Sequence, residues 1–407
     1  MTVVTEISAA DVEKLGTGPI PNKIYWDPNW FSAERDRVFR RVWLCVARTV
    51  DVASPGNYIV KDIETCRASV IIARGRDGQL RAFHNVCSHR NMRVCLDKKG
   101  STARFTCRYH GFSYDLDGQL RSVPDEEYFF GLDKGANGLT PVALETCGTF
   151  IFINLDPKPK QQLKEFLGEL YDRLESFPIG DWASSFSFGG EAPLNWKCVM
   201  DNFQESYHFA FTHARTVVDR ATGSANVFGH SLSFEFFGPH RVLTNWGNLD
   251  HKCAPVEQLA AEYGGGFGQS AILVGLKDSD SAAKRSPNLS SYAYSLFPNV
   301  QIVVAPSYMH LIQFIPLDAE TTHWVVTMYF PKAKSAGERL SQEYTMAIAK
   351  DVITEDMSVF PHIQDGMMCG AKEFVNFHRN ESLCRHLAMM IQAYTEETTR
   401  GQTEVGR

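Results

Sequence analysis

Apolar residues near the start of the chain recur at helical intervals. After Asp27, the residues Phe31, Val38, Phe39 and Val42 are spaced so that they would share one side of a helix. The proline that follows Asp27 suits the first turn of a helix, where a missing N–H costs nothing. We therefore predict a helix in this segment.

The pattern then changes to short runs rich in β-branched residues. Two such runs, 69–73 and 80–83, flank an Asp-Gly pair that begins at Asp77, and a second Asp-Gly pair begins at Asp117. Asp-Gly between two apolar runs is a strong hairpin signal. This strand–turn–strand texture predicts a small all-β domain at residues 46–156.

The rest of the chain mixes helices and strands. Residues 156–160 alternate proline and lysine, which is typical of a linker, and 163–177 has the pattern of an amphipathic helix. Apolar runs at 302–304 and 324–326 predict strands, and we expect a long helix across about 337–360.

These elements predict an α+β protein of two domains, or of one large core with an insertion. Outside the all-β domain we group residues 1–45 and 157–407, which carry the other predicted helices and strands. Pro361 falls inside the late helical run, and we expect it to kink or end the helix.

Composition and charge exclude several classes of function. The chain has 407 residues with 44% hydrophobic and 22% charged residues, which is ordinary for a globular protein. A net charge of -6 without a basic run argues against nucleic acid as a main partner. No apolar stretch is long enough for a membrane span, and the acidic N-terminus does not resemble a secretory signal. Scattered cysteines indicate reduced thiols, and we expect a cytoplasmic protein.

Two mixed pairs of cysteine and histidine stand out within the predicted all-β domain. Cys87 and His89 are separated by one residue, and Cys107 and His110 by two. Two thiolates and two imidazoles suit a [2Fe–2S] cluster with one iron held by sulfur and the other by nitrogen. A structural zinc takes the same ligands, but zinc fingers usually place both cysteines in one pair and both histidines in the other.

The surrounding residues closely resemble a known family. The stretches 85–90 and 107–115 are similar to the two cluster-binding loops of the Rieske-type ring-hydroxylating oxygenases. The resemblance implies an all-β Rieske domain inserted in a helix-grip-like catalytic domain. It also implies that Cys87, His89, Cys107 and His110 bind the cluster.

A second constellation lies in the larger predicted domain. His208 and His213 are five residues apart, which on a regular helix places them about 140° from each other. An irregular turn could bring both to one metal, although two histidines at this spacing more often only pack or hydrogen-bond. Beside the cluster motif, the segment looks like the mononuclear-iron motif of the same oxygenases, which bind Fe(II) by two histidines and one carboxylate.

The third iron ligand must come from elsewhere in the chain. Residues 354–357 resemble the late helix of the family, in which the aspartate after a glutamate is the ligand. This resemblance points to Asp356, with Glu355 and Asp365 as alternatives. A solvated acidic helix face would have the same appearance in the sequence.

Glu205 occupies the position where the family usually has aspartate. There the carboxylate bridges a cluster histidine of one subunit and an iron histidine of its neighbour, so the resemblance gives Glu205 a catalytic role. Some relatives that act on quaternary ammonium substrates such as carnitine have glutamate at this position. The alternative is an ordinary surface salt bridge.

The resemblance implies the oxygenase α subunit of a Rieske non-heme iron system. Such an enzyme uses O₂ for dihydroxylation, monohydroxylation or oxidative dealkylation of a small organic substrate. Because no glycine-rich phosphate-binding motif for NADH or flavin is visible, a separate reductase must supply electrons, with or without a ferredoxin. We expect a homotrimer, with or without a β subunit. A Rieske electron-transfer protein without oxygenase activity is the alternative of another class.

The substrate is less well indicated than the chemistry. Phe203, Phe209 and Phe211 flank the predicted iron ligands, and 297–300 precedes a strand of the expected pocket wall. Aromatic linings suit an aromatic compound, which we favour, or the trimethylammonium group of a carnitine or betaine. The same phenylalanines could instead belong to the core.

Overall fold

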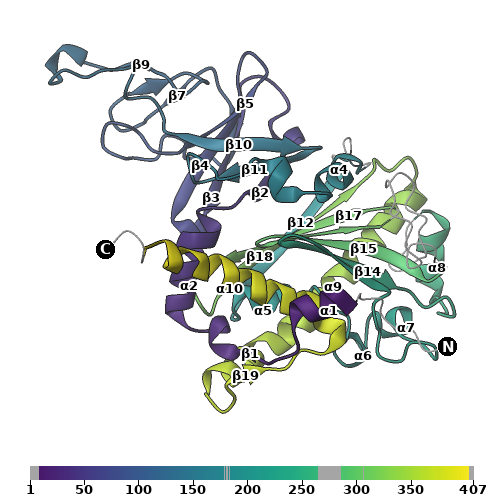
Figure 1. Ribbon diagram of the computed structural model, residues 1–407. Helices are drawn as coiled ribbons and strands as arrows, with labels where there is room; N and C mark the ends of the chain where they lie inside the picture. Colours follow the sequence, from purple (N-terminus) through teal and green to yellow (C-terminus); the bar gives the residue numbers. More distant parts are fainter. Residues whose placement is uncertain are drawn as a thin grey trace. The chain divides into compact units, whose positions relative to one another are not determined.

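The chain divides into two compact units. A computed structural model describes residues 9–177, 179, 182, 184–264, 286–305 and 307–402. One unit consists of residues 35–166, and the other of the segments before and after it, 1–34 and 167–407. The large unit is therefore interrupted in sequence by the small one (Figure 1). The bounds 46 and 156 that we expected from the sequence stay a prediction.

The small unit is built from antiparallel strands. Its larger sheet has seven strands in the order β2-β11-β10-β5-β4-β3-β6, and a second sheet has the order β7-β8-β9. The strands are β2 (Leu44–Arg48), β3 (Asn57–Ile63), β4 (Ala68–Arg74), β5 (Leu80–His84), β6 (Lys99–Ser101), β7 (Phe105–Thr106), β8 (Ser113–Tyr114), β9 (Leu120–Ser122), β10 (Pro141–Cys147) and β11 (Phe150–Asn154).

Both predicted hairpin turns are present. Gly78 has a φ of 80° between β4 and β5, and Gly118 has a φ of 82° between β8 and β9. A left-handed backbone is easy for glycine and strained for other residues, so each Asp-Gly pair reverses the chain at low cost. Under these turns lies an apolar core that includes Ile71, Phe83 and Phe105.

The large unit contains one seven-stranded antiparallel sheet in the order β12-β18-β17-β16-β15-β14-β13. Along β18 every second residue is buried, which is the period expected of a strand with one face against a core. The expected combination of helices with an antiparallel sheet is confirmed. The strands are β12 (Ser184–Ala192), β13 (Ser233–Phe237), β14 (His240–Trp246), β15 (Leu289–Leu296), β16 (Val300–Val304), β17 (Met309–Pro316) and β18 (Thr322–Phe330).

Helices from both ends of the chain belong to this unit. A short strand pair, β1 (Ile20–Pro21) with β19 (Phe374–Val375), ties the N-terminal segment to a late one. The predicted helix after Asp27 is present, but its α-helical part is short, since α2 is followed by a π-helical segment over Arg35–Phe39. The helices are α1 (Ala9–Leu15), α2 (Pro28–Glu34), α5 (Trp196–Asn202), α6 (Phe209–Thr212), α7 (Val218–Ala221), α8 (Pro255–Glu262), α9 (Ala336–Met368) and α10 (Ser382–Gln402).

Two predicted helices differ from what we expected. The run 163–177 forms two helices, α3 (Leu163–Leu167) and α4 (Leu170–Glu175), because Gly168 has a φ of 55°. We expected Pro361 to kink or end the late helix, and it does not end it, because α9 continues to Met368. Buried residues hold α9 on both sides of the proline, among them Phe360 before it and Gln364 after it. Gln364 accepts a hydrogen bond from the main chain of Asn195.

In the part of the chain that the structure describes, no helix is both long and apolar enough to cross a bilayer.

Candidate active site

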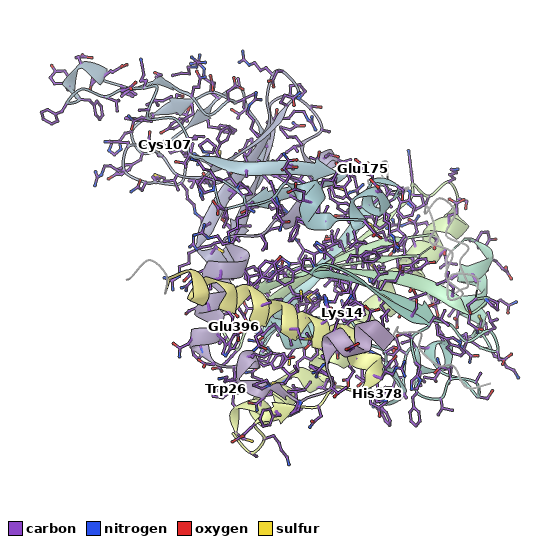
Figure 2. All side chains as sticks on the ribbon, in the orientation of Figure 1. Lys14, Trp26, Cys107, Glu175, His378 and Glu396 are labelled. Carbon is purple, nitrogen blue, oxygen red and sulfur yellow. The ribbon has the colours of Figure 1, made fainter. Side chains whose placement is uncertain are left out.

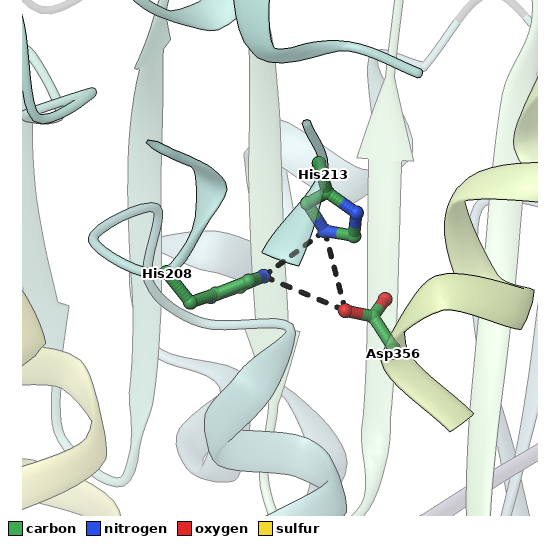
Figure 3. A group of neighbouring side chains, drawn as sticks. All are labelled: His208, His213 and Asp356. Carbon is green, nitrogen blue, oxygen red and sulfur yellow. Dashed lines mark hydrogen bonds and ion pairs between the residues drawn. The ribbon is translucent and has the colours of Figure 1, made fainter. Parts of the chain in front are cut away.

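The two histidines of the large unit lie at opposite ends of one helical turn. His208 caps the start of α6 and His213 caps its end with a non-helical backbone, φ -97° and ψ 32°. This irregular turn closes the angle that a regular helix would leave between them. Their Nε2 atoms lie 3.1 Å apart (Figure 3).

Asp356 completes the group from the middle of α9. Its Oδ1 lies 3.6 Å from Nε2 of His208 and 3.2 Å from Nε2 of His213. The side chain of Asp356 is only 2% exposed, and Oδ1 has no hydrogen-bond partner among the described residues. This buried carboxylate oxygen faces two imidazoles and has no other partner in the part of the chain that the structure describes. Burying its negative charge costs free energy unless a cation lies nearby to compensate.

Each histidine is hydrogen-bonded to a glutamate through Nδ1, the ring nitrogen that faces away from the other two side chains. Nδ1 of His208 is bonded to Glu205, which also accepts the main-chain N–H of Tyr207 and His208. Nδ1 of His213 lies 2.9 Å from Glu355, and the hydroxyl of Thr216 donates to the same oxygen at 2.6 Å.

These contacts decide which ring nitrogens carry protons. A carboxylate beside Nδ1 favours the tautomer with the proton on Nδ1, which leaves a lone pair on Nε2. The two Nε2 lone pairs then point at each other and at Asp356, an arrangement that repels unless a cation lies between them. Metal–nitrogen bonds of about 2.1 Å at right angles place two ligand atoms about 3.0 Å apart. The three side chains therefore fit one metal ion in a facial arrangement.

The alternative carboxylates have other positions. Glu355 contacts Nδ1 of His213, the nitrogen that faces away from the group of three. Asp365 is exposed farther along α9. Among the described residues, the metal-binding atoms of His208, His213 and Asp356 lie within 4.8 Å of one another.

Charges on both sides act on His213. Two opposing effects act on the pKa of its imidazole: burial lowers it, and the neighbouring carboxylates of Asp356 and Glu355 raise it. The carboxylates prevail, so the pKa of His213 lies above its usual value. The site is thus electrostatically suited to positive charge.

A cavity of about 140 Å³ opens beside the three ligand atoms, between α9 and strands β14 to β17. Four aromatic side chains contribute to its wall: Phe203, Phe209, Trp246 and Tyr308. The ring of Phe209 lies 4.9 Å from that of His208 and 5.1 Å from that of His213. The cavity therefore offers aromatic surface next to the predicted iron position.

The sequence indicated only part of this wall. Phe203 and Phe209 line the cavity, whereas Phe211 is 66% exposed and lies outside the lining set. The segment 297–300 also lies outside that set, because the cavity begins farther along β16.

Several lining residues were not found from the sequence. They are polar or aromatic side chains without a motif, and they come from α7, from β14, from the residue before β17 and from β17 itself: Arg220, Trp246, Tyr308 and His310. For the two on strands, the only available signal was the alternation along the strand, which assigns a face but not a cavity.

The cysteine–histidine loops of the small unit have the same main-chain construction. The amide of Cys87 donates to Met92, and its carbonyl accepts from Asn91. The amide of Cys107 donates to Phe112, and its carbonyl accepts from Gly111. The residue four positions after each cysteine has a left-handed backbone, with φ 60° and 75° respectively.

The two loops bring their cysteine and histidine side chains close together. Cys107, on the second loop, is labelled in Figure 2. The two cysteines are 2% exposed, and the rings of His89 and His110 lie 4.4 Å apart. Nδ1 of His89 is buried and has no partner among the described residues, as expected of a ligand atom whose metal supplies the missing contact. Burial raises the pKa of the Cys87 thiol, with a smaller opposing effect from Tyr114. Metal binding would offset the cost of the buried thiolate.

Tyr114 stands directly behind Cys87. Its hydroxyl lies 3.2 Å from Sγ of Cys87, 2.8 Å from Oγ of Ser88, and accepts the amide of Ser88 at 3.0 Å. Burial raises the pKa of Tyr114 to about 12, so its hydroxyl remains a donor. Hydrogen bonds to cluster sulfurs tune reduction potential, so Tyr114 is placed to adjust a cluster held here.

Comparison with known families gives two matches within this chain. Residues 42–134 match the Rieske [2Fe-2S] domain, and residues 179–397 match the ring hydroxylating alpha subunit (catalytic domain). The second match covers more than half of the chain and includes all three members of the buried group.

Two of the relatives are named for quaternary ammonium compounds. The chain is 28% identical over 354 residues to the carnitine monooxygenase oxygenase subunit of Escherichia coli K12, covering 86% of this chain and 84% of that one. It is 34% identical over 201 residues to the glycine betaine monooxygenase oxygenase subunit of Chromohalobacter salexigens, covering 49% and 44%.

The fold is also shared with a solved aromatic dioxygenase. The structure of naphthalene 1,2-dioxygenase from Rhodococcus sp. matches with a TM-score of 0.74 and 21% identity, covering 96% of this chain and 97% of that one. At this identity the match shows the common fold.

Proposed function

The chain belongs to the family of ring-hydroxylating α subunits with a Rieske [2Fe-2S] domain, and we propose that it hydroxylates a small quaternary ammonium compound. It is a Rieske-type oxygenase, the terminal component of its system. The cofactors of this family are the [2Fe-2S] cluster and a mononuclear iron. The Rieske match favours the cluster over a structural zinc, and the catalytic-domain match argues against an electron-transfer protein alone.

The single observation that carries the proposal is the buried group of His208, His213 and Asp356 at the end of an aromatic cavity. We assign these three side chains as the residues that would hold the iron. Bound Fe(II) supplies O₂ activation, and the cluster supplies electrons. Glu205 and Glu355 fix the tautomers, and the surrounding apolar side chains exclude water.

We propose the cluster ligands from the two cysteine–histidine loops. We assign Cys87, His89, Cys107 and His110, with the sulfurs buried and the imidazoles half-buried. Electrons would come from a separate reductase, with or without a ferredoxin.

Quaternary ammonium substrates are favoured over the aromatic compound that we preferred from the sequence. The carnitine and glycine betaine monooxygenase subunits are the relatives that support this change. Phe203, Phe209, Trp246 and Tyr308 line the cavity and offer aromatic surface to a trimethylammonium group, since aromatic faces attract cations. Glu205 also supports this choice, because some relatives that act on quaternary ammonium substrates such as carnitine have glutamate at the corresponding position.

We also propose a head-to-tail trimer in which Glu205 links the two kinds of centre. Its carboxylate already holds His208, and exposed aromatic side chains stand close by, with Tyr207 near both Phe211 and Phe228. Apolar groups exposed together suit contact with another copy of the chain. Sedimentation that shows an active monomer would reject this assembly and the bridging role of Glu205.

The proposed function is tested with purified protein, a surrogate reductase and NADH. Carnitine, glycine betaine and a set of aromatic acids are compared for O₂ uptake and for oxidised product. We expect product from a quaternary ammonium compound and about three irons with two sulfides per chain. Product from aromatic acids alone would overturn the substrate assignment while leaving the oxygenase assignment intact.

A further inference from the structure

One row of side chains crosses the floor of the cavity from strand to strand. In register, Leu243 of β14 is opposite Ala293 of β15, Ala293 is opposite Val303 of β16, and Val303 is opposite His310 of β17. All four residues line the cavity. His310 is the polar member of an otherwise apolar row.

His310 is buried without satisfied hydrogen bonds. The residue is 9% exposed, and neither Nδ1 nor Nε2 has a partner among the described residues. Two other polar residues of the sheet floor are satisfied: Asn245 donates to Ser291 at 3.0 Å, and Gln301 donates to the carbonyl of Phe203. The unsatisfied nitrogens of His310 therefore require a separate explanation.

The protonation state of His310 follows from its surroundings. Burial lowers its pKa to about 4, so the ring is neutral at pH 7 and offers one N–H donor and one acceptor nitrogen. Leaving such a group unpaired in a buried position costs free energy. A ligand that supplies a hydrogen-bonding atom would recover this free energy on binding.

The polar residues of the cavity wall indicate which kind of ligand atom His310 would bind. The ring of Tyr308 lies 6.1 Å from that of His310, and Arg220 is also among the lining residues. Nε of Arg220 lies 2.9 Å from Glu257, which anchors this cation in place. A buried arginine and a neutral N–H donor in one cavity suit the oxygen atoms of a carboxylate.

We propose that His310 determines substrate specificity by donating a hydrogen bond to a carboxylate of the substrate, while the substrate's trimethylammonium group lies against Phe209. The proposal rests on the proposed function and adds the requirement for a carboxylate. Phe209 is adjacent to both iron-side histidines, so this orientation brings the N-methyl groups toward the reacting position. His310 is a binding residue in this account and takes no part in electron transfer.

The test uses two ligands of equal length in the enzyme loaded with cluster and iron. One is γ-butyrobetaine, and the other is butyltrimethylammonium, which lacks the carboxylate. His310→Phe keeps a ring of similar shape and removes both nitrogens. We expect it to raise the Kd and KM of γ-butyrobetaine about 5- to 100-fold, and to change those of butyltrimethylammonium less than twofold. His310→Gln, which retains an N–H donor, should restore part of the difference.

A matched control separates ligand recognition from the general effect of changing a buried histidine. His386 on α10 is 7% exposed, also has an unpartnered Nδ1 among the described residues, and lies outside the cavity lining. His386→Phe should leave the ratio of the two affinities unchanged. The cluster absorption and the Tm of each variant report whether it folds.

The outcomes distinguish this inference from the proposed function. Equal weakening of both ligands by His310→Phe, or no weakening of either, would overturn the role of His310 while quaternary ammonium binding stands. If neither ligand binds the wild-type enzyme, the proposed function fails, and the carboxylate requirement fails with it. If His310→Phe does not fold, the same affinity ratio is measured with His310→Gln and His310→Asn, and an unchanged ratio in both would reject the proposal.

Discussion

The two metal-binding regions of this chain hold their histidines by different means. In the small unit, the turns that carry His89 and His110 are closed by main-chain hydrogen bonds, and both turns contain a left-handed residue. In the large unit, His208 and His213 are each held by a glutamate at Nδ1. The first site thus depends on backbone conformation. The second depends on side-chain hydrogen bonds, one local, from Glu205 to His208, and one from Glu355 on the distant helix α9 to His213.

This difference has chemical consequences. A cluster that changes its charge by one electron benefits from a rigid backbone and from a few tuned contacts to sulfur, such as the Tyr114 hydroxyl. A site that holds a divalent cation and keeps positions open benefits from surrounding negative charge. Substitutions should therefore damage the two sites independently, and the following predictions test that separation.

The largest effect is expected for Asp356→Ala. Removing the third ligand should abolish the mononuclear iron and product formation, while the cluster keeps its colour. Iron and sulfide analysis together with product assays measures both effects. Unchanged iron and activity would point to Glu355 or Asp365 as the ligand instead.

Glu355→Gln should weaken iron binding about 10- to 100-fold, the range typical of residues that orient metal ligands. The amide keeps the shape of the side chain but no longer stabilises the proton on Nδ1 of His213. Chelator competition measures the affinity, and Asp365→Asn on an exposed part of α9 is the matched control. A similar loss in both variants would indicate a general effect of charge.

Gly111→Ala should reduce cluster loading and leave mononuclear iron in place. Its φ of 75° costs an alanine about 1–2 kcal/mol, and the added Cβ would lie 3.0 Å from Pro124. Gly131→Ala is the control, because Gly131 has a φ of 69° with open space around it. Sulfide content and visible absorption measure cluster loading in both variants. An equal loss of cluster in both would show that the contact with Pro124 does not matter.

Tyr114→Phe should lower the reduction potential of the cluster without loss of iron. The variant removes a hydrogen bond that stabilises the more negative, reduced state. Redox titration measures the shift, with the exposed Tyr109 changed to Phe as the control. An unchanged potential in Tyr114→Phe would show that the hydroxyl only positions Ser88.

The smallest effect concerns stability in acid. Burial lowers the pKa of His386 to about 3, compared with about 6.5 in an unfolded chain. As the pH falls below about 6.5, the unfolded state binds a proton that the folded state does not, so the free energy of unfolding decreases until the pH approaches 3. His386→Phe should therefore lose less Tm between pH 7 and pH 5 than the wild type. An identical loss would contradict the burial of a neutral ring.

Local signals in the sequence were enough to predict the cysteine–histidine loops and the hairpins. Each Asp-Gly pair acts through its own backbone, and the four predicted cluster ligands lie in two short segments. The approach of His208, His213 and Asp356 could be proposed only through a family resemblance, because packing of α9 brings the aspartate to the histidines. That packing also holds the helix through Pro361, where the local preference of proline predicted a kink or an end.

The cavity wall could not be predicted. Arg220, Trp246 and His310 come from different elements, and strand register and chain packing decide their meeting rather than any motif. The substrate depends on these residues, which is why the sequence indicated the chemistry more securely than the molecule that is oxidised.

The most direct test of the account is the incorporation of isotope-labelled O₂ into product. Purified wild-type enzyme, a surrogate reductase and NADH are given carnitine, glycine betaine or an aromatic acid, and the products are analysed by mass spectrometry. The account predicts label in a hydroxylated product, or in the fragment released from it, with a quaternary ammonium substrate. No product from any quaternary ammonium compound, together with labelled product from the aromatic acid, would contradict it.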